Sequence, residues 1–240
     1  MQSRVFLCTC ILLVHLGTCL SRRNVAAIKF KDCDHVRAAG FVKNKTYTVW
    51  INEKNSFKVR CEHGISGSYA LIMARLNGTE HFNRSWREYR RGFGNPDFNH
   101  WLGLDNIHYL TARGYHILTV YMIDWYAVSK AVRYFHFNVS GAPNYQLSIR
   151  DYLGQVPDDL LYNHGMNFAT YDKPDYNNCA QKLRAGWWYN DCTYALPTGV
   201  YYSGGDYRPN AGFYDGMFWK DWRGYGHSLK IIYIYISTFV

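Results

Sequence analysis

Residues 151–227 show almost no hydrophobic periodicity, and this stretch constrains the fold more than any other feature of the sequence. Glycine, aspartate, asparagine, tyrosine and tryptophan are dense throughout it, without strand-like or helix-like spacing of apolar residues. Ordering so long a loop-rich segment costs conformational entropy unless a covalent link or a bound ion holds it. We therefore expect the Cys179–Cys192 disulfide or a bound ion to hold these loops.

The N-terminal residues 1–21 have the layout of a secretory signal peptide. Arg4 precedes an apolar run from Val5 to Leu20, and small residues mark the exit. The run is 16 residues long and contains His15, whereas a membrane-spanning helix needs roughly 20 apolar residues. We expect a secreted protein with no membrane span, a signal peptide at 1–21 and a short lead-in at 22–30; a signal anchor is the alternative.

Removal of that leader leaves four cysteines in the chain: Cys33, Cys61, Cys179 and Cys192. In an oxidising compartment four cysteines form two disulfides, with three alternative pairings. Proximity in sequence favours Cys33 with Cys61 and Cys179 with Cys192, because short loops close at the least entropic cost. Zinc is the competing interpretation, but the sequence has no CxxC pair.

Composition indicates one domain with a basic surface. The chain has 240 residues, 48% of them hydrophobic, which suits a single core over 31–240 with subregions at about 31–67, 68–150 plus 228–240, and 151–227. The formal charge of +9 attracts anionic glycans and cell surfaces. No nucleic-acid-binding motif is present.

N-glycosylation is allowed at four sequons, Asn44, Asn77, Asn83 and Asn138.

Local patterns predict several elements. Ser85 and Glu88 have the spacing of a capping box at the start of a short helix that ends at Gly92, and Asp105 is expected to cap a second helix. Apolar residues at 117–123 predict a central strand, because both alternating faces are apolar. The other predicted strands are 68–75, 131–139, 145–149 and 229–240.

An ordered set of motifs resembles the fibrinogen C-terminal-like (fibrinogen-related) domain, the globular module of fibrinogen chains, tenascins, ficolins, tachylectins, angiopoietins and microfibril-associated glycoproteins. The resemblance runs from about Phe30 to the C-terminus. The motifs are, in order, Asp32-Cys33, Arg60-Cys61, Asn77-Gly78, Phe82-Asn83-Arg84-Ser85-Trp86, Gly92-Phe93-Gly94, Trp101-Leu102-Gly103-Leu104-Asp105, Asn178-Cys179-Ala180, Gly186-Trp187-Trp188-Tyr189, Gly199-Val200-Tyr201-Tyr202, and Trp219 with Trp222 and Gly224.

The resemblance implies an α+β fold in three parts. These are a small disulfide-closed N-terminal subdomain, a central twisted antiparallel sheet with short helices, and a loop-rich C-terminal subdomain that carries the binding sites. It also implies the disulfide pairing that proximity favours.

The same resemblance implies a calcium ion in the loop before Asn178-Cys179-Ala180. Hard cations prefer such cages of carboxylate and carbonyl oxygens. Here the loop is short and has two acids, Asp172 and Asp175, which with carbonyls near Asn177 would form a weak site. The alternative is that Lys173 and Pro174 replace the ion by neutralising and stiffening the loop.

Lectin-like members of the family hold an acetyl group beside the second disulfide, between aromatic rings and polar donors. The corresponding residues are Asp191, Cys192, Thr193, Tyr202 and Phe213. The family has histidine at the position of Thr193, asparagine at that of Thr198 and tyrosine at that of Phe213, so three polar contacts are altered. We expect a pocket whose ligand either differs from the family's or is absent.

Two functions of different classes follow from these features. The first is a lectin-like recognition protein for acetylated or other surface glycans, in innate defence; the second is an extracellular-matrix or cell-surface module that binds proteins. A single sugar site is weak, so the chain either forms a small homo-oligomer or binds one partner tightly. No catalytic motif is present, and the nearest general-base cluster, His164 with Asp158 and Asp159, is better explained as polar loop residues.

Overall fold

The computed structural model describes residues 28–209 and 211–238. The predicted signal peptide and most of the lead-in lie outside these residues. Within the described ranges, no helix is long and apolar enough to cross a membrane.

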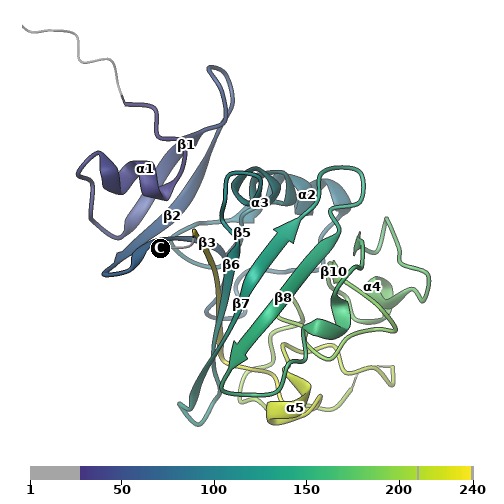
Figure 1. Ribbon diagram of the computed structural model, residues 1–240. Coiled ribbons are helices and arrows are strands. Elements are labelled where there is room, and N and C mark those ends of the chain that lie inside the picture. The colour runs from purple at the N-terminus through teal and green to yellow at the C-terminus, as the bar shows by residue number, and fades with distance from the viewer. Residues whose placement is uncertain (1–27, 210, 239–240) are drawn as a thin grey trace, which may run out of the picture.

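One mostly antiparallel sheet dominates the described part of the chain (Figure 1). Its main path has the spatial order β1 (Lys45–Trp50), β2 (Ser56–Gly64), β3 (Gly67–Arg75), β11 (Ile231–Ser237), β6 (Ile117–Ile123), β7 (Ser129–Val139) and β8 (Leu147–Gly154). The short strand β5 (His100–Trp101) pairs with β3, and β4 (Phe93–Gly94) pairs with β5. Strand β9 (Phe168–Ala169) pairs separately with β10 (Trp187–Trp188). The N-terminal hairpin therefore continues the central sheet.

The central strands follow from their residue pattern. In β6 the buried residues Leu118, Val120 and Met122 alternate with partly exposed ones, and the strand pairs with β11 on one side and β7 on the other. The predicted central strand at 117–123 is thus confirmed. The strands predicted at 68–75, 131–139, 145–149 and 229–240 correspond to β3, β7, β8 and β11, with ends that differ by up to five residues.

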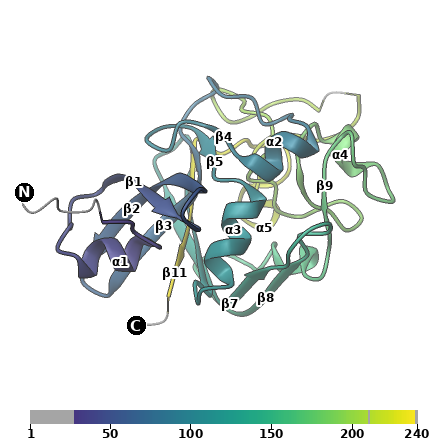
Figure 2. The ribbon, with the colours of Figure 1, turned by 90° about the horizontal axis from the view of Figure 1, so that it is seen from above.

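The helices are short. They are α1 (Cys33–Ala38), α2 (Trp86–Arg91), α3 (Leu104–Thr111), α4 (Cys179–Lys182), α5 (Lys220–Arg223) and a 3-10 turn, η1 (Leu161–Asn163). Helices α1 and α3 pack on strands of the main sheet, whereas α4 and α5 lie among the C-terminal loops (Figure 1). Figure 2 shows α3 lying against the sheet near β7. The buried face of α3 consists of Leu104, Ile107, Leu110 and Thr111.

The starts of α2 and α3 differ in how well the sequence predicted them. Ser85 and Glu88 form the predicted capping box of α2. Asp105 does not cap α3, because Gly103 is the capping residue and no side chain bonds there. Gly103 has φ 103° and passes so close to Arg91 that a Cβ would lie 2.7 Å from its carbonyl carbon. Asp105 instead accepts hydrogen bonds from the Tyr145 hydroxyl and from Arg90.

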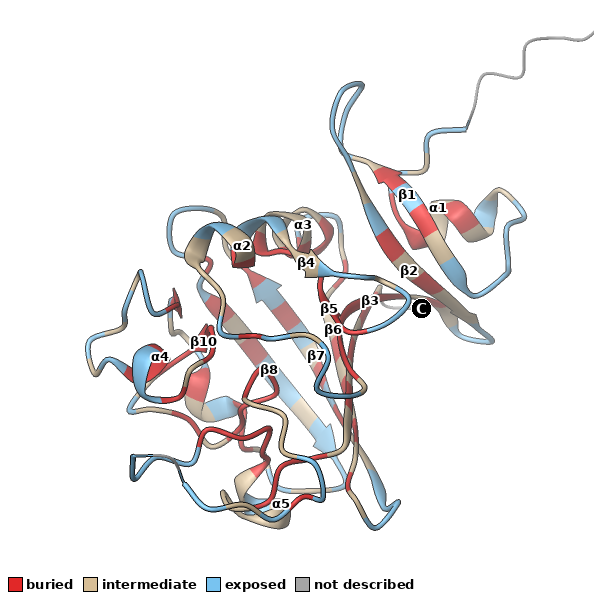
Figure 3. Cartoon of the chain, turned by 180° about the vertical axis from the view of Figure 1, so that it is seen from behind, coloured by how far each residue is buried: buried red, intermediate tan, exposed pale blue. Residues whose placement is uncertain are grey.

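The C-terminal part is mostly loops, yet it contains much of the core. Figure 3 shows buried stretches along these loops as well as on the strands. Trp187 and Trp188 are both buried, and Trp188 packs against Phe168 and Trp101. The aromatic residues of these loops belong to the same buried core as the strands, and they order the loops in addition to the disulfide that the sequence predicted.

Candidate binding site beside the second disulfide

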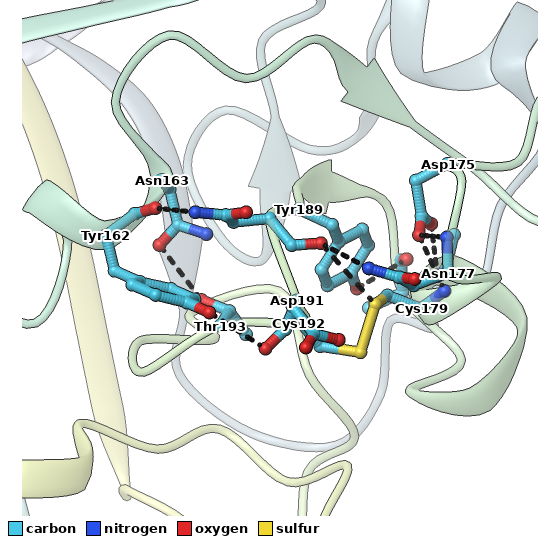
Figure 4. Close-up of a disulfide and its surroundings, with 12 residues drawn as sticks. Tyr162, Asn163, Asp175, Asn177, Cys179, Tyr189, Asp191, Cys192 and Thr193 are labelled. Atoms are coloured by element: carbon cyan, nitrogen blue, oxygen red, sulfur yellow. Dashed lines mark hydrogen bonds between the residues drawn. A yellow bond between two sulfur atoms is a disulfide. The ribbon is translucent and has the colours of Figure 1, made fainter.

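Both disulfides have the predicted pairing. Cys33–Cys61 joins α1 to β2, and Cys179–Cys192 joins the first residue of α4 to the loop that follows β10. Figure 4 shows the second bond among polar side chains from three loops. It closes a segment whose ends are 13 residues apart.

Asp175 bonds to the backbone at the start of α4. Its Oδ1 accepts from the amides of Asn177 and Cys179 at 3.1 and 2.9 Å, and its Oδ2 accepts from the Ala180 amide at 3.0 Å. A carboxylate at this position satisfies helix-start amides that would otherwise lack partners. Both oxygens of Asp175 are therefore engaged in holding the loop.

Asp172 is engaged in a different place. Its Oδ1 accepts from the Trp86 amide at 2.8 Å and from the Thr170 hydroxyl at 2.7 Å. This bond ties the acidic loop to the first residue of α2. The two predicted calcium-binding carboxylates thus serve separate backbone segments.

Lys173, which lies between these acids in sequence, is fixed by α2 and by the loop before β8. Its ammonium lies 3.6 Å from the centre of the Trp86 ring and donates to the Pro143 carbonyl oxygen. Burial and the nearby Arg90 lower the pKa of this lysine from its usual value. A fixed cation is therefore already present in the acidic loop.

These contacts do not fit a calcium cage. Within the residues that the structure describes, no three His, Cys, Asp or Glu side chains gather in a group that could hold a metal ion. The side chain of Asn177 donates to the Asn190 carbonyl oxygen at 3.4 Å. Calcium would have to displace the backbone amides that now donate to Asp172 and Asp175.

Thr193, the residue at the family's histidine position, faces the interior. Its side chain is buried, and its hydroxyl lies 2.6 Å from the Ala195 carbonyl oxygen and 3.0 Å from Asn163 Oδ1. The Ala195 amide donates back to the same hydroxyl. This hydroxyl is therefore part of a local turn and has no free hydrogen for a ligand in this arrangement.

Tyr202 belongs to an ion-pair network. Its hydroxyl donates to Asp215 Oδ1 at 2.9 Å and accepts from Arg184 Nη2 at 3.0 Å. The same Asp215, which is 1% exposed, accepts from Arg184 Nε at 2.6 Å. The ring of Tyr202 stacks on Tyr207 with centres 4.0 Å apart. No local pattern predicts this network, because Arg184, Tyr202 and Asp215 lie 13 to 31 residues apart.

The remaining predicted pocket residues lie at the surface. Asp191 is exposed and its carbonyl oxygen accepts from the Tyr162 hydroxyl, while Phe213 is 40% exposed with the Lys182 ammonium 5.5 Å from its ring centre. A cavity of about 430 Å³ does lie beside the acidic loop. Its lining includes Asp175, Tyr176, Asn177, Tyr189 and Asn190 rather than the five predicted residues.

Exposed aromatic rings surround α4. Tyr176 is 99% exposed, and Tyr171 and Phe213 are each exposed by about two fifths. The Tyr171 carbonyl oxygen accepts from Gln181, and Phe213 lies near Lys182, so both are next to α4. We call Tyr171, Tyr176 and Phe213 the α4 rim.

The residues considered as a general-base cluster have structural partners. Asp158 accepts from the Tyr134 hydroxyl and the Leu161 amide, Asp159 from the Asp221 amide, and His164 from the Ile149 amide. They act in loop and strand contacts, as the polar-loop interpretation predicts.

All four sequon asparagines, Asn44, Asn77, Asn83 and Asn138, are exposed. The Asn44 and Asn77 side chains use their oxygens as acceptors for nearby donors. N-glycosylation at these positions stays a prediction.

Residues 29–238 match the family described as fibrinogen beta and gamma chains, C-terminal globular domain. The chain belongs to this family. Bovine (Bos taurus) angiopoietin-related protein 1 is 35% identical over 214 residues, which are 87% of this chain and 43% of the relative. Angiopoietin-related protein 2 from Mus musculus is 36% identical over 86% of this chain and 43% of its own length. The chain thus spans less than half the length of these relatives.

Solved structures agree with this assignment. The fibrinogen-like globe domain of human ANGPTL2 superposes with a TM-score of 0.83 at 33% identity, covering 88% of this chain and all of that one. Lamprey fibrin D-dimer, in complex with the peptide Gly-His-Arg-Pro-amide, superposes with a TM-score of 0.82 at 28% identity. The match covers 89% of this chain and 75% of the lamprey chain. The predicted fold class is confirmed, and so is the prediction that the chain is not an enzyme.

Proposed function

We propose that this chain is a secreted recognition domain that binds extracellular or cell-surface proteins through the α4 rim. The observation that carries the proposal is the exposure of Tyr171, Tyr176 and Phe213 around one short helix. Aromatic side chains are enriched in protein interfaces and supply much of their binding energy. The Cys179–Cys192 bond and Asp175 hold α4 and the loop before it, so little conformational freedom is lost there on binding.

Two further observations support the proposal. The leader-like layout of residues 1–21 and the two disulfides suit an oxidising, extracellular compartment. A solved relative of the same fold, lamprey fibrin D-dimer, holds a peptide ligand. We infer that the present domain also recognises a group on a protein.

Glycan binding is the second candidate, and one observation favours it. The cavity of about 430 Å³ beside the acidic loop has asparagine and tyrosine side chains in its wall, which is the chemistry expected for a sugar site. Against an acetyl pocket at the predicted position, the hydroxyls of Thr193 and Tyr202 are engaged within the protein. We propose that calcium is dispensable for either activity, because Lys173 holds the loop where an ion would otherwise do so.

The experiment separates the two candidates with the glycosylated, secreted protein. It is passed over N-acetylglucosamine resin in calcium, with elution by EDTA and, separately, by free sugar; the proposal expects flow-through. Binding to cultured cells is measured in parallel, before and after protease treatment of the cells. Tyr176→Ala and Phe213→Ala should each reduce cell binding at least about fivefold.

The matched control is Ile65→Ala, which removes a fully exposed apolar side chain at the turn between β2 and β3. It should leave cell binding unchanged. Retention on the resin that both EDTA and free sugar release would instead establish the calcium-dependent lectin. Cell binding that survives protease, or that all three variants lower equally, would reject the protein-binding proposal.

A further inference from the structure

A second cavity, of about 440 Å³, lies between the loop that follows β3 and the segment 198–201. Figure 2 shows the connection from β3 to α2 running beside the C-terminal loops. Gly78 permits this approach, because a Cβ there would lie 3.3 Å from the Tyr201 ring. Apart from Arg184, the cavity is lined by residues outside the contacts described around the second disulfide.

Arg75, the last residue of β3, forms part of the cavity wall although its side chain is almost completely buried. It is 1% exposed. Its Nη1 donates to the Gly199 carbonyl oxygen at 2.7 Å, and its guanidinium lies 4.0 Å from the centre of the Phe82 ring. Its Nε has no hydrogen-bond partner within the described residues.

No carboxylate among the described residues forms an ion pair with Arg75. Burial lowers the pKa of Arg75 to about 10, so the guanidinium remains charged at neutral pH. A buried charge without a counter-charge is costly, and an unpaired donor beside it adds to the cost. An anion in the cavity would place a counter-charge beside the guanidinium.

A second arginine lines the same cavity. Arg184 has a left-handed backbone with φ 50°, and its Nε and Nη2 bind Asp215 and Tyr202. Its side chain is 38% exposed, and Nη1 makes none of these bonds. The one acid in the wall, Glu80, is paired with Arg84 at 2.6 Å.

We propose that this cavity binds the carboxylate group of an acidic sugar. The planar fork of an arginine matches the two oxygens of a carboxylate. A volume of this size holds one or two sugar rings, and the wall combines the Tyr201 ring with the polar side chains of His81 and Asn83. Asn83 is also a sequon residue, so a glycan attached there would stand at the mouth of the cavity.

The test titrates the glycosylated full chain with sodium glucuronate and with N-acetylneuraminate, and follows binding by calorimetry and by the melting temperature. Glucose and sodium chloride at equal ionic strength are the control solutes. We expect both acids to bind with a Kd of about 1 mM and to raise the melting temperature, whereas the controls do neither. Failure of both acids to act beyond sodium chloride would overturn the proposal.

Variants test the charges separately. Glu80→Gln removes the acid from the wall and should tighten binding about threefold to tenfold. Glu53→Gln, an exposed acid that pairs with Lys29 instead, is the matched control and should change nothing. Arg75→Lys keeps the charge without the fork and should weaken binding about tenfold. If Arg75→Lys unfolds, Glu80→Gln and Glu53→Gln still test the site. Equal changes in the Kd of the sugar acids for these two variants would reject it.

The affinity of Asn83→Gln for the free sugar acids shows whether the carboxylate comes from a glycan on this chain or from outside. If a glycan on the chain itself supplies the carboxylate, the variant should bind free acid more tightly than the parent protein. If the acid comes from outside, the two affinities should be equal. Either result supports the site, and stabilisation by sulfate and phosphate but by neither sugar acid would overturn the carboxylate assignment.

Discussion

The Lys173 ammonium lies 3.6 Å from the centre of the Trp86 ring, so a side chain of the acidic loop is anchored on the first residue of α2. The same loop reaches α2 a second time, where Asp172 accepts from the Trp86 amide. Two neighbouring residues of opposite charge thus hold one tryptophan, one by its ring and one by its backbone.

We predict that Lys173→Met destabilises the domain and that EDTA does not. Loss of the cation–π contact and of the bond to Pro143 should cost about 1–2 kcal/mol, or a fall of about 2–8 °C in melting temperature for a domain of this size. Differential scanning calorimetry in calcium and in EDTA measures both effects. Lys43→Met, at an exposed position, is the control, and a calcium-dependent rise in the parent protein would contradict the prediction.

Replacing Arg184 should lower the free energy of unfolding more than replacing Asp215 does. Arg184→Met leaves a buried carboxylate with one hydroxyl donor, which typically costs about 3–5 kcal/mol. Asp215→Asn keeps an acceptor for Tyr202 and leaves a guanidinium that is partly solvated, so its cost should be smaller. Urea unfolding of both variants at pH 7 measures the two losses of stability. Equal losses would show that burial of the Asp215 carboxylate does not decide the cost of breaking this ion pair.

Stability should fall with rising pH because of Asp159. Burial and the neighbouring Asp221 raise the pKa of Asp159 to about 7, against about 3.9 in an unfolded chain. Since the folded state holds this proton more tightly, the stabilisation is complete below about pH 4 and is lost as pH rises through about 7.

Asp159→Asn removes that proton and keeps an oxygen that can accept from the Asp221 amide. The variant should therefore be more stable than the parent at pH 8, by a few kcal/mol, up to about 4, and the advantage should vanish near pH 4. Chemical unfolding across pH 4–8 measures it. The exposed Asp191→Asn serves as control, and parallel pH profiles for parent and Asp159→Asn would refute the assignment.

Removing the second disulfide should loosen the α4 rim. For ends 13 residues apart, chain entropy alone gives a cost of about 3 kcal/mol for Cys179→Ala combined with Cys192→Ala. Hydrogen exchange should then rise in residues 171–192 before it rises in β6. Loss of Cys33–Cys61 should leave exchange at the rim unchanged, and a rise there would show that the two bonds act on one cooperative unit.

Local chemistry explains which parts of the fold were predictable. The capping box of α2 depends on two residues three apart, and the β6 pattern depends on seven consecutive ones. The local sequence also predicted Asp105 as the cap of α3, and this prediction was wrong. Gly103 packs closely on Arg91 and the Tyr145 hydroxyl donates to Asp105, and both are tertiary contacts that the local sequence does not show. Helix ends are decided by such contacts whenever two candidate caps lie close together.

The site was less predictable for the same reason. Resemblance named Thr193 and Tyr202, but it did not reveal that the Thr193 hydroxyl faces Ala195 or that the Tyr202 hydroxyl bonds Asp215. Arg75 reads in the sequence as the polar end of an apolar strand, and only its contact with Gly199 shows a buried cation. Arg75 and Gly199 are 124 residues apart, so neither segment carries a pattern that reveals the contact.

Strand β11 lies between β3 and β6 although it is the last strand in the sequence. During synthesis, β1–β3 and β6–β8 therefore emerge as two half-sheets whose inner edges have no partner. Each half can form hairpins early, but the two can join only when residues 231–237 have left the ribosome and entered the gap. Until then those open edges are the places where a chaperone would bind or where another nascent chain would pair.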